Sequence, residues 1–220
     1  AYKITSNYHG NTAGNISIVF LDTNNKAKDG TDYNNYAKYP SVSNGAMSEY
    51  VIHPAFDYGG TAISGLWIGK FESSHTACTT DATTGQNNTD TTNLTLQIKP
   101  GVTSWRKITI SNMFQVCLNM NNENNVYGLP DDTVIDPHLM KNTEWGAVAY
   151  LSQSAEYGKA SEVWINNSSE YITGSAGDGA NASEGTGTTN DYTSENGQQA
   201  STTGNVYGIY DLNGGSLEYV

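Results

Sequence analysis

Aromatic and amide side chains gather in one segment of this sequence, and their chemistry suits the binding of a sugar or a protein surface. Tyr33, Tyr36 and Tyr39 recur at three-residue spacing in a loop-like region, and Asn35 stands between them. Tyrosine rings offer flat apolar faces, and Asn side chains both donate and accept hydrogen bonds, as in adaptable antibody loops. We therefore expect a ligand-binding surface here, with Tyr192 contributing from a later loop. Tyrosines packed in the interior would give the same sequence pattern.

A small acidic loop gives a second candidate site. Asp131, Asp132 and Asp136 lie close together ahead of an expected helix, and carboxylates with backbone carbonyls are ligands that calcium prefers. The loop lacks the alternating ligand spacing of a dedicated calcium loop, so a solvated loop is the other interpretation. The four histidines show no helical or hairpin metal spacing, and we expect structural or surface roles for them.

The two cysteines, Cys78 and Cys117, are too few for a disulfide scaffold and do not have zinc-site spacing. Cys78 lies in a polar loop and Cys117 on an apolar stripe. One interpretation is a loop thiol and a separate buried thiol. The other is a disulfide between them, which an extracellular location would favour. The sequence contains no Gly-x-Ser-x-Gly motif and no phosphate-binding loop after a strand, so no catalytic residue is assigned.

Composition excludes several classes of protein. The 220 residues carry a net charge of -12, which opposes sequence-independent binding to nucleic acid. No apolar run reaches the roughly 18 residues of a membrane span. Charged residues are only 15% of the chain, while Asn, Thr, Ser and Gly are abundant and tyrosines number 15. The sequence starts and stops within strand-like patterns, and we therefore expect it to be part of a longer protein.

Short elements separated by long loops predict an α+β domain over residues 1–220. Hydrophobic patterning predicts strands at 16–21, 50–56, 65–72 and 94–98. The segment 174–205 consists almost wholly of small and polar residues, with Tyr192 as its only large apolar anchor. Such a loop gains order only by lying over a domain that is already folded.

Two helices are expected between these strands. In the first, Ser111 caps a helix whose apolar stripe is formed by Phe114, Cys117 and Leu118. The second begins at Asn142 or Thr143 and carries Glu144 in its first turn. Its inner face is expected to hold Trp145, Val148 and Ala149, with Trp145 buried against the strand that contains Trp67.

Three segments resemble the formylglycine-generating (sulfatase-modifying factor) family. Residues 205–219 read Asn-Val-Tyr-Gly-Ile-Tyr-Asp-Leu-Asn-Gly-Gly-Ser-Leu-Glu-Tyr, similar to the family's Asn-x-x-Gly-Leu-Tyr-Asp-Met-x-Gly-Asn-Val-Trp-Glu-Trp motif. Residues 138–150 resemble its Arg-Leu-Pro-Thr-Glu-Ala-Glu-Trp helix, and residues 66–72 its early strand. The resemblance implies a C-type-lectin-like fold rich in loops. It also implies that Glu144 and Glu218 hold loops by accepting hydrogen bonds from backbone amides.

The departures from that family bear on activity. Its oxidase members use a cysteine pair well after the last motif, a position that neither Cys78 nor Cys117 occupies. The residues within these motifs resemble those of a non-catalytic subgroup found in Gram-positive surface, prepilin-like and prophage proteins. We therefore expect a non-enzymatic binding or display domain of an extracellular appendage or phage particle, without a required cofactor, that contacts a glycan, a protein or identical subunits. The alternatives are a pilin-like structural subunit and an oxidase whose cysteines lie beyond residue 220.

Overall fold

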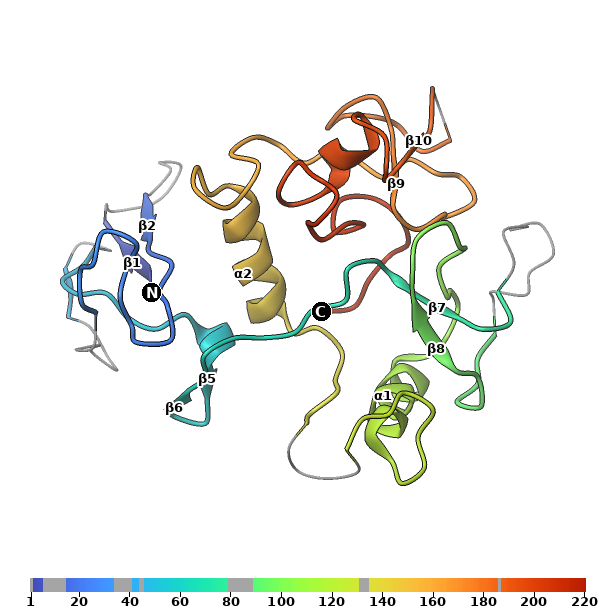
Figure 1. The fold of residues 1–220 in the computed structure, drawn as a ribbon, viewed down its shortest axis with the longest axis horizontal. Helices are drawn as coiled ribbons and strands as arrows, with labels where there is room; N and C mark the ends of the chain where they lie inside the picture. Colours follow the sequence, from blue (N-terminus) through green and yellow to red (C-terminus); the bar gives the residue numbers. More distant parts are fainter. Residues whose placement is uncertain are drawn as a thin grey trace. The chain divides into compact units, whose positions relative to one another are not determined.

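A computed structural model describes residues 2–5, 15–33, 41–43, 46–78, 89–130, 135–185 and 187–220. The chain divides into two compact units, Ala1–Trp67 and Ile68–Val220, and each is described by itself (Figure 1). Small two-stranded sheets, two α-helices and long loops make this a mixed α and β protein, as the sequence predicts at that level. Within the described ranges no helix is long and apolar enough to cross a membrane. The single domain over 1–220 stays a prediction.

The first unit is built from three small antiparallel sheets. Their strands are β1 (Tyr2–Ile4) with β2 (Ile16–Ile18), β3 (Val42–Ser43) with β4 (Ala46–Met47), and β5 (Asp57–Tyr58) with β6 (Thr61–Ala62). The turn between β5 and β6 consists of Gly59 and Gly60, both at positive φ, which is the backbone that a tight hairpin of this length needs.

The strand predicted at 50–56 is replaced in part by a short 3₁₀ helix, η1 (Pro54–Phe56). Pro54 fixes φ at a helical value and has no N–H to give to a strand ladder. The ring Nδ1 of His53 accepts a hydrogen bond from the Ala55 amide at 3.3 Å, which caps the turn. The prediction of a strand through Phe56 is therefore wrong.

The second unit begins with a hairpin-like sheet covered by a helix. Strand β7 (Ser73–His75) pairs with β8 (Leu96–Ile98), and helix α1 (Ile110–Leu118) follows, continued by η3 (Asn119–Asn121). Trp105, Ile108 and Val116 form a buried cluster there, against which Leu94, Leu96 and Met113 also pack. The buried His75 ring meets Trp105 edge-on at 4.9 Å between ring centroids.

Helix α1 presents a different stripe from the one predicted. Val116 and Cys117 are buried, whereas Phe114 is 52% exposed and Leu118 is exposed as well. The sequence offers two overlapping apolar stripes, and the cluster around Trp105 selects the one that contains Met113. The helix begins after Thr109 rather than at a Ser111 cap, and Asp90 accepts hydrogen bonds from Thr109 and Asn112 at its start. Asp90 Oδ1 lies 2.9 Å from the backbone nitrogen of Thr109 and 2.7 Å from Nδ2 of Asn112.

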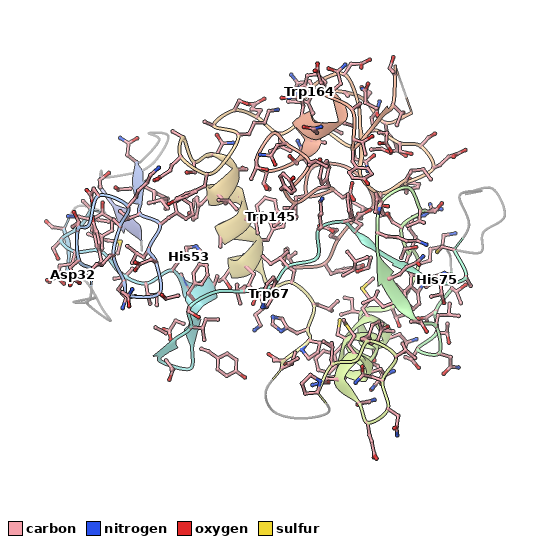
Figure 2. All side chains as sticks on the ribbon, viewed as in Figure 1. Asp32, His53, Trp67, His75, Trp145 and Trp164 are labelled. Carbon is pink, nitrogen blue, oxygen red and sulfur yellow. The ribbon has the colours of Figure 1, made fainter. Side chains whose placement is uncertain are left out.

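Helix α2 (Asn142–Ser152) starts where the sequence predicts. Its buried side chains are Glu144, Val148 and Ser152, and Trp145 is only half-buried. Trp67, labelled in Figure 2, is fully exposed and lies outside any strand. The predicted burial of Trp145 against a strand containing Trp67 is therefore wrong. Residues 65–72 form no strand ladder, because their described backbone bonds go to a distant loop rather than to a neighbouring strand.

The segment 174–205 acquires order from buried small residues and from backbone bonds. It contains β9 (Ser175–Ala176), its antiparallel partner β10 (Asn190–Asp191), and η4 (Gly197–Ala200). Ala176 and Ala200 are buried in a cluster with Phe71 and Tyr210, on which Tyr192 and Trp164 also pack. Small side chains bury at little entropic cost, so this part of the chain needs fewer large apolar anchors than its composition suggests.

Candidate functional site

A polar hollow of about 330 Å³ opens on the surface of the second unit. Its walls consist of hydroxyl and carboxylate side chains, glycine backbone and one aliphatic side chain: Ser168, Ser169, Glu170, Ile172, Ser175, Gly185, Gly187, Thr189 and Asp191. Ser175 and Asp191 face each other as a register pair of the β9–β10 sheet. The hollow lies in a part of the chain where the sequence suggested only a loop.

The floor of the hollow is fixed by one buried amide. Asn166 donates from Nδ2 to the carbonyl of Ile172 at 2.8 Å and accepts a bond at Oδ1 from the Ser168 amide at 3.1 Å. The Ser168 hydroxyl in turn accepts from the Ile172 amide at 3.1 Å. Asn166 is 3% exposed, so two lining residues, Ser168 and Ile172, are anchored to a buried side chain.

Asp211, from the C-terminal part of the chain, also bonds to Asn166. Its Oδ1 accepts hydrogen bonds from Asn166 Nδ2 and from the Gly174 amide, both at 2.9 Å. Its Oδ2 accepts from the amide of Glu72 at 3.2 Å. Three N–H donors from three distant segments therefore converge on one carboxylate that is 2% exposed.

Glu72 is the neighbouring buried carboxyl, at 7% exposure. Its Oε1 accepts from the Ser216 amide at 2.8 Å, and its Oε2 makes a short contact with the Ser104 hydroxyl. Gly215, at φ 73°, lies so close that a Cβ there would stand about 3.0 Å from the Glu72 carboxyl. Glycine suits that position, because the backbone angle is one that other residues rarely adopt and an added Cβ would press on the Glu72 carboxyl.

Burial and like charge shift the titration of this pair. Desolvation, followed by the nearby charge of Asp211, raises the pKa of Glu72 to about 9. Desolvation also raises the pKa of Asp211, to about 6, although its three donors act in the other direction. Glu218 is more exposed than the other two carboxyls. Desolvation by the surrounding protein, followed by the nearby charge of Asp211, raises its pKa to about 7. Among the described residues no hydrogen bond to Glu218 is seen, so its expected loop-holding role stays a prediction.

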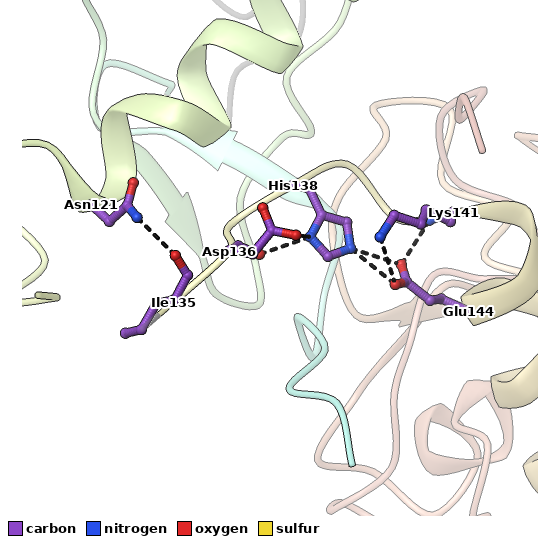
Figure 3. Close-up of polar contacts among 6 residues, drawn as sticks. All are labelled: Asn121, Ile135, Asp136, His138, Lys141 and Glu144. Carbon is purple, nitrogen blue, oxygen red and sulfur yellow. Dashed lines mark hydrogen bonds and ion pairs between the residues drawn. The ribbon is translucent and has the colours of Figure 1, made fainter. Parts of the chain in front are cut away.

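His138 and Glu144 form a second polar cluster at the start of α2 (Figure 3). The imidazole Nε2 lies 2.9 Å from Glu144 Oε1, and Nδ1 lies 2.7 Å from the Asp136 carbonyl oxygen. Both ring nitrogens face acceptors, an arrangement that a doubly protonated imidazolium satisfies. Glu144 Oε2 accepts from the Lys141 amide at 2.8 Å, which is the backbone-holding role expected for this residue. These contacts attach the segment that precedes α2 to the first turn of the helix.

The predicted tyrosine surface is described only in part. Asn35, Tyr36 and Tyr39 lie outside the described residues. Tyr33 is half-buried and meets Tyr50 edge-on, with 5.2 Å between ring centroids. Tyr192 is half-buried too, and its ring packs against Phe71 and Tyr210 in the core cluster. Neither described ring stands free on the surface, and the tyrosine loop as a ligand site stays a prediction.

The acidic loop is also described only in part, because Asp131 and Asp132 lie outside the described residues. Asp136 contacts His138 through Oδ2 at 3.2 Å from Nδ1. Over the described ranges, no three His, Cys, Asp or Glu side chains are grouped so that they could hold a metal ion. Calcium binding by the acidic loop stays a prediction.

Both cysteines are free thiols in the structure. Cys117 is buried on α1, and Cys78 is half-buried in the loop after β7. Burial raises the pKa of the Cys117 thiol, which keeps it protonated and unreactive at neutral pH. The choice between two separate thiols and a disulfide under oxidising conditions stays a prediction.

Three comparisons with known proteins add no relative. No protein-family model matches this chain, and neither a curated protein nor a solved structure matches it. The site therefore has to be interpreted from its own geometry.

No pattern in the sequence indicates the hollow or the buried polar residues that bond to its lining. Asp211 and Glu72 stand in segments that carry the family resemblance, but no local pattern indicated that they lie side by side. Asn166 and the serines around it occur in a polar run that is typical of an exposed loop. A buried role for such residues is visible only when the partners of their polar atoms are known.

Proposed function

We propose that this chain is a non-enzymatic binding or display domain whose second unit binds a hydroxyl-rich ligand, a glycan, in the polar hollow. The observation that carries the proposal is the composition of the walls: four hydroxyl side chains and two carboxylates surround a volume of about 330 Å³. Hydroxyl and carboxylate groups together match the donors and acceptors of sugar hydroxyls.

The chemistry of the walls favours a polar ligand over an apolar one. Pockets for drug-like molecules are lined mainly by hydrophobic and aromatic side chains, whereas Ile172 is the single large apolar residue here. Two lining residues are held by the buried Asn166, which bonds to Ile172 at 2.8 Å and to Ser168 at 3.1 Å and is itself bonded to Asp211 at 2.9 Å. A preformed floor reduces the ordering cost of binding. Two carboxylates and no base in the walls favour neutral or amino sugars over acidic ones.

The proposal includes a C-type-lectin-like fold for the second unit. Two segments that carry the family resemblance, although about 140 residues apart, are bonded to each other. The Tyr210 amide donates to the Lys70 carbonyl at 2.8 Å, and the Ser216 amide donates to Glu72 at 2.8 Å. This pairing of the early and late motifs supports the resemblance. With it we propose an extracellular location on a bacterial surface or a phage particle, where a protein surface is the other candidate ligand.

A glycan array with the intact chain tests the proposal. Thr189→Trp places a bulky side chain into the hollow from an exposed wall position, and Thr61→Trp on strand β6 of the first unit is the matched control. We expect Thr189→Trp to abolish any glycan signal while Thr61→Trp keeps it. Glu170→Gln, at an exposed wall carboxylate, should reduce binding of amino sugars more than of neutral ones.

Two results would contradict the proposal. The first is the absence of any glycan signal from the intact chain at millimolar monovalent ligand. The second is binding that survives Thr189→Trp but is lost when Tyr33, Tyr36 and Tyr39 are replaced by Ala together, which would move the site to the first unit.

A further inference from the structure

Tyr171 has a backbone conformation that tyrosine rarely adopts. Its φ is 55°, in the left-handed region, where a bulky side chain is crowded and glycine or asparagine is common. The residue closes a turn, because its amide donates to the Ser168 carbonyl at 3.0 Å. Backbone preference alone favours glycine at this position, so the tyrosine side chain must make contacts that offset the cost of the conformation.

Three contacts hold Tyr171 in this conformation. The Arg106 guanidinium lies over the tyrosine ring, 4.1 Å from the ring centroid. The Tyr171 hydroxyl donates a hydrogen bond to Glu184 Oε1 at 3.0 Å. The Tyr171 carbonyl accepts from the Ser104 amide at 2.9 Å. The ring, the hydroxyl and the backbone are therefore each fixed by a different residue of the second unit.

The bond between Tyr171 and Glu184 joins two segments that contribute to the lining of the hollow. Glu170 and Ile172, on either side of Tyr171, both line the hollow. Glu184 immediately precedes Gly185, a lining residue of the later segment. Tyr171 is not itself a lining residue, so it acts on the hollow through its neighbours in the chain.

Glu170 is the lining carboxylate with the greater freedom to meet a ligand. Asp191, the other one, accepts hydrogen bonds at Oδ1 from the amide of Thr193, at 2.9 Å, and from its hydroxyl. Within the described ranges Glu170 makes no hydrogen bond or ion pair, and it is exposed. An ionised carboxylate with unoccupied acceptor positions suits the ammonium group of a ligand.

We propose that Tyr171, through its bond to Glu184, positions Glu170 to bind the ammonium group of an amino sugar in the hollow. This inference rests on the proposed glycan function of the second unit. The turn at Tyr171 sets the direction of the Glu170 backbone, and the contacts of the ring and the hydroxyl keep that turn from relaxing. When the hydroxyl is lost, the backbone at Tyr171 relaxes toward a commoner conformation, and Glu170 moves with it.

Hydrogen exchange in the ligand-free chain tests the bond between the two segments. The Gly185 amide donates to the Asn167 carbonyl at 2.7 Å, one residue after the acceptor of the Tyr171 hydroxyl. We expect Tyr171→Phe to speed exchange at Gly185 about fivefold, the effect of losing one exposed hydrogen bond. Tyr207→Phe, at an exposed ring, is the matched control and should leave this rate unchanged. An unchanged rate in Tyr171→Phe would overturn the proposal.

Sugar selectivity tests the positioning of Glu170. NMR titrations at about pH 6 with glucosamine, whose amine is then protonated, and with glucose give a ratio of affinities that a uniform loss of folded protein does not change. Tyr171→Phe should lower the preference for glucosamine about fivefold. Glu184→Gln keeps an oxygen that accepts from the Tyr171 hydroxyl and should retain most of the preference, whereas Glu184→Ala should behave like Tyr171→Phe.

The outcomes separate this inference from the proposed function. If the wild type binds both sugars and Tyr171→Phe keeps the wild-type ratio, the positioning role is refuted and the glycan function stands. A preference lost in Glu184→Gln but kept in Tyr171→Phe would assign the ammonium to Glu184 itself and would also refute the role of Tyr171. A wild type that binds neither sugar would remove the proposed function, and this inference with it.

Discussion

Two carboxyl clusters of the second unit use the same kinds of residue in opposite ways. Glu144 takes its partners, the Lys141 amide and the His138 ring, from residues three and six positions away. Glu72 and Asp211 take theirs from segments 32 to 144 residues away. In the first cluster Glu144 is buried, but the side chains of His138 and Lys141 beside it are partly exposed. The second is buried and contains no described cation.

The difference appears in the direction of the pKa shifts. Burial acts to raise the pKa of Glu144, but the hydrogen bonds from the Lys141 amide and from His138 outweigh it and lower the pKa. At Glu72 and Asp211 burial prevails, and the pKa values are raised. The comparison shows that the balance between burial and hydrogen-bond donors, rather than the residue type, decides the direction in which the pKa of a carboxyl shifts.

The largest expected effect is at Asp211. Asp211→Ala leaves the amides of Glu72 and Gly174 and the side chain of Asn166 without their shared acceptor, and it should lower the free energy of unfolding by about 3–5 kcal/mol. Asp136→Ala, at an exposed carboxyl of the helix cluster, should cost less than about 1 kcal/mol. Urea denaturation of both variants measures the difference, and similar losses would break the comparison.

The next effect separates two glycines. Gly214 has φ 89°, and a Cβ there would stand 2.3 Å from the Asn166 carbonyl, so Gly214→Ala should destabilise by about 2–3 kcal/mol. Gly146 lies within α2 with nothing within 4 Å of an added Cβ. Gly146→Ala should therefore stabilise by up to about 1 kcal/mol, the helix-propensity difference. Thermal unfolding of the two variants gives the sign of each change in stability. An unchanged stability of Gly214→Ala would mean that the backbone at position 214 does not pack closely against Asn166.

At Glu144 the effect is smaller and confined to acid. A lowered carboxyl pKa contributes stability that is present above the unfolded value, near 4.5, and is lost as the pH falls through the folded value. Glu144→Gln should cost about 1 kcal/mol at pH 7 and flatten the acid side of the stability curve. Melting temperatures of the wild type and of Glu144→Gln from pH 3 to pH 9 measure this effect. If the loss of stability in acid were the same for both, Glu144 would not stabilise the start of the helix as an anion.

The smallest effect is expected at Trp67. Its indole is fully exposed, so Trp67→Ala should change the free energy of unfolding by less than about 0.5 kcal/mol. Phe71, four residues later, is buried among Ala176, Ala200 and Tyr210, and Phe71→Ala should cost about 3–5 kcal/mol. Chemical denaturation gives both values, and a large loss at Trp67 would show that its ring has a partner in solution.

Local patterns predicted local features well. Helix α2 and its first-turn Glu144 follow from residues 141–152, because helix caps and apolar spacing act within one or two turns. The stripe of α1 was predicted incorrectly, since Met113, Phe114, Val116, Cys117 and Leu118 allow two faces and only the Trp105 cluster chooses between them. The segment 65–72 has the composition of a strand, yet in its described backbone bond the Lys70 carbonyl accepts from the distant Tyr210 amide.

The sequence by itself determined a polar, acidic chain of short elements, two helices and long loops, because composition and spacing act over a few residues. It could not determine that a Ser- and Gly-rich segment would surround a hollow, or that Glu72 would lie against Asp211. Those features depend on hydrogen bonds between residues up to 144 positions apart. Only the tertiary structure brings such groups together, and burial then makes their protonation and their pairing matter for stability.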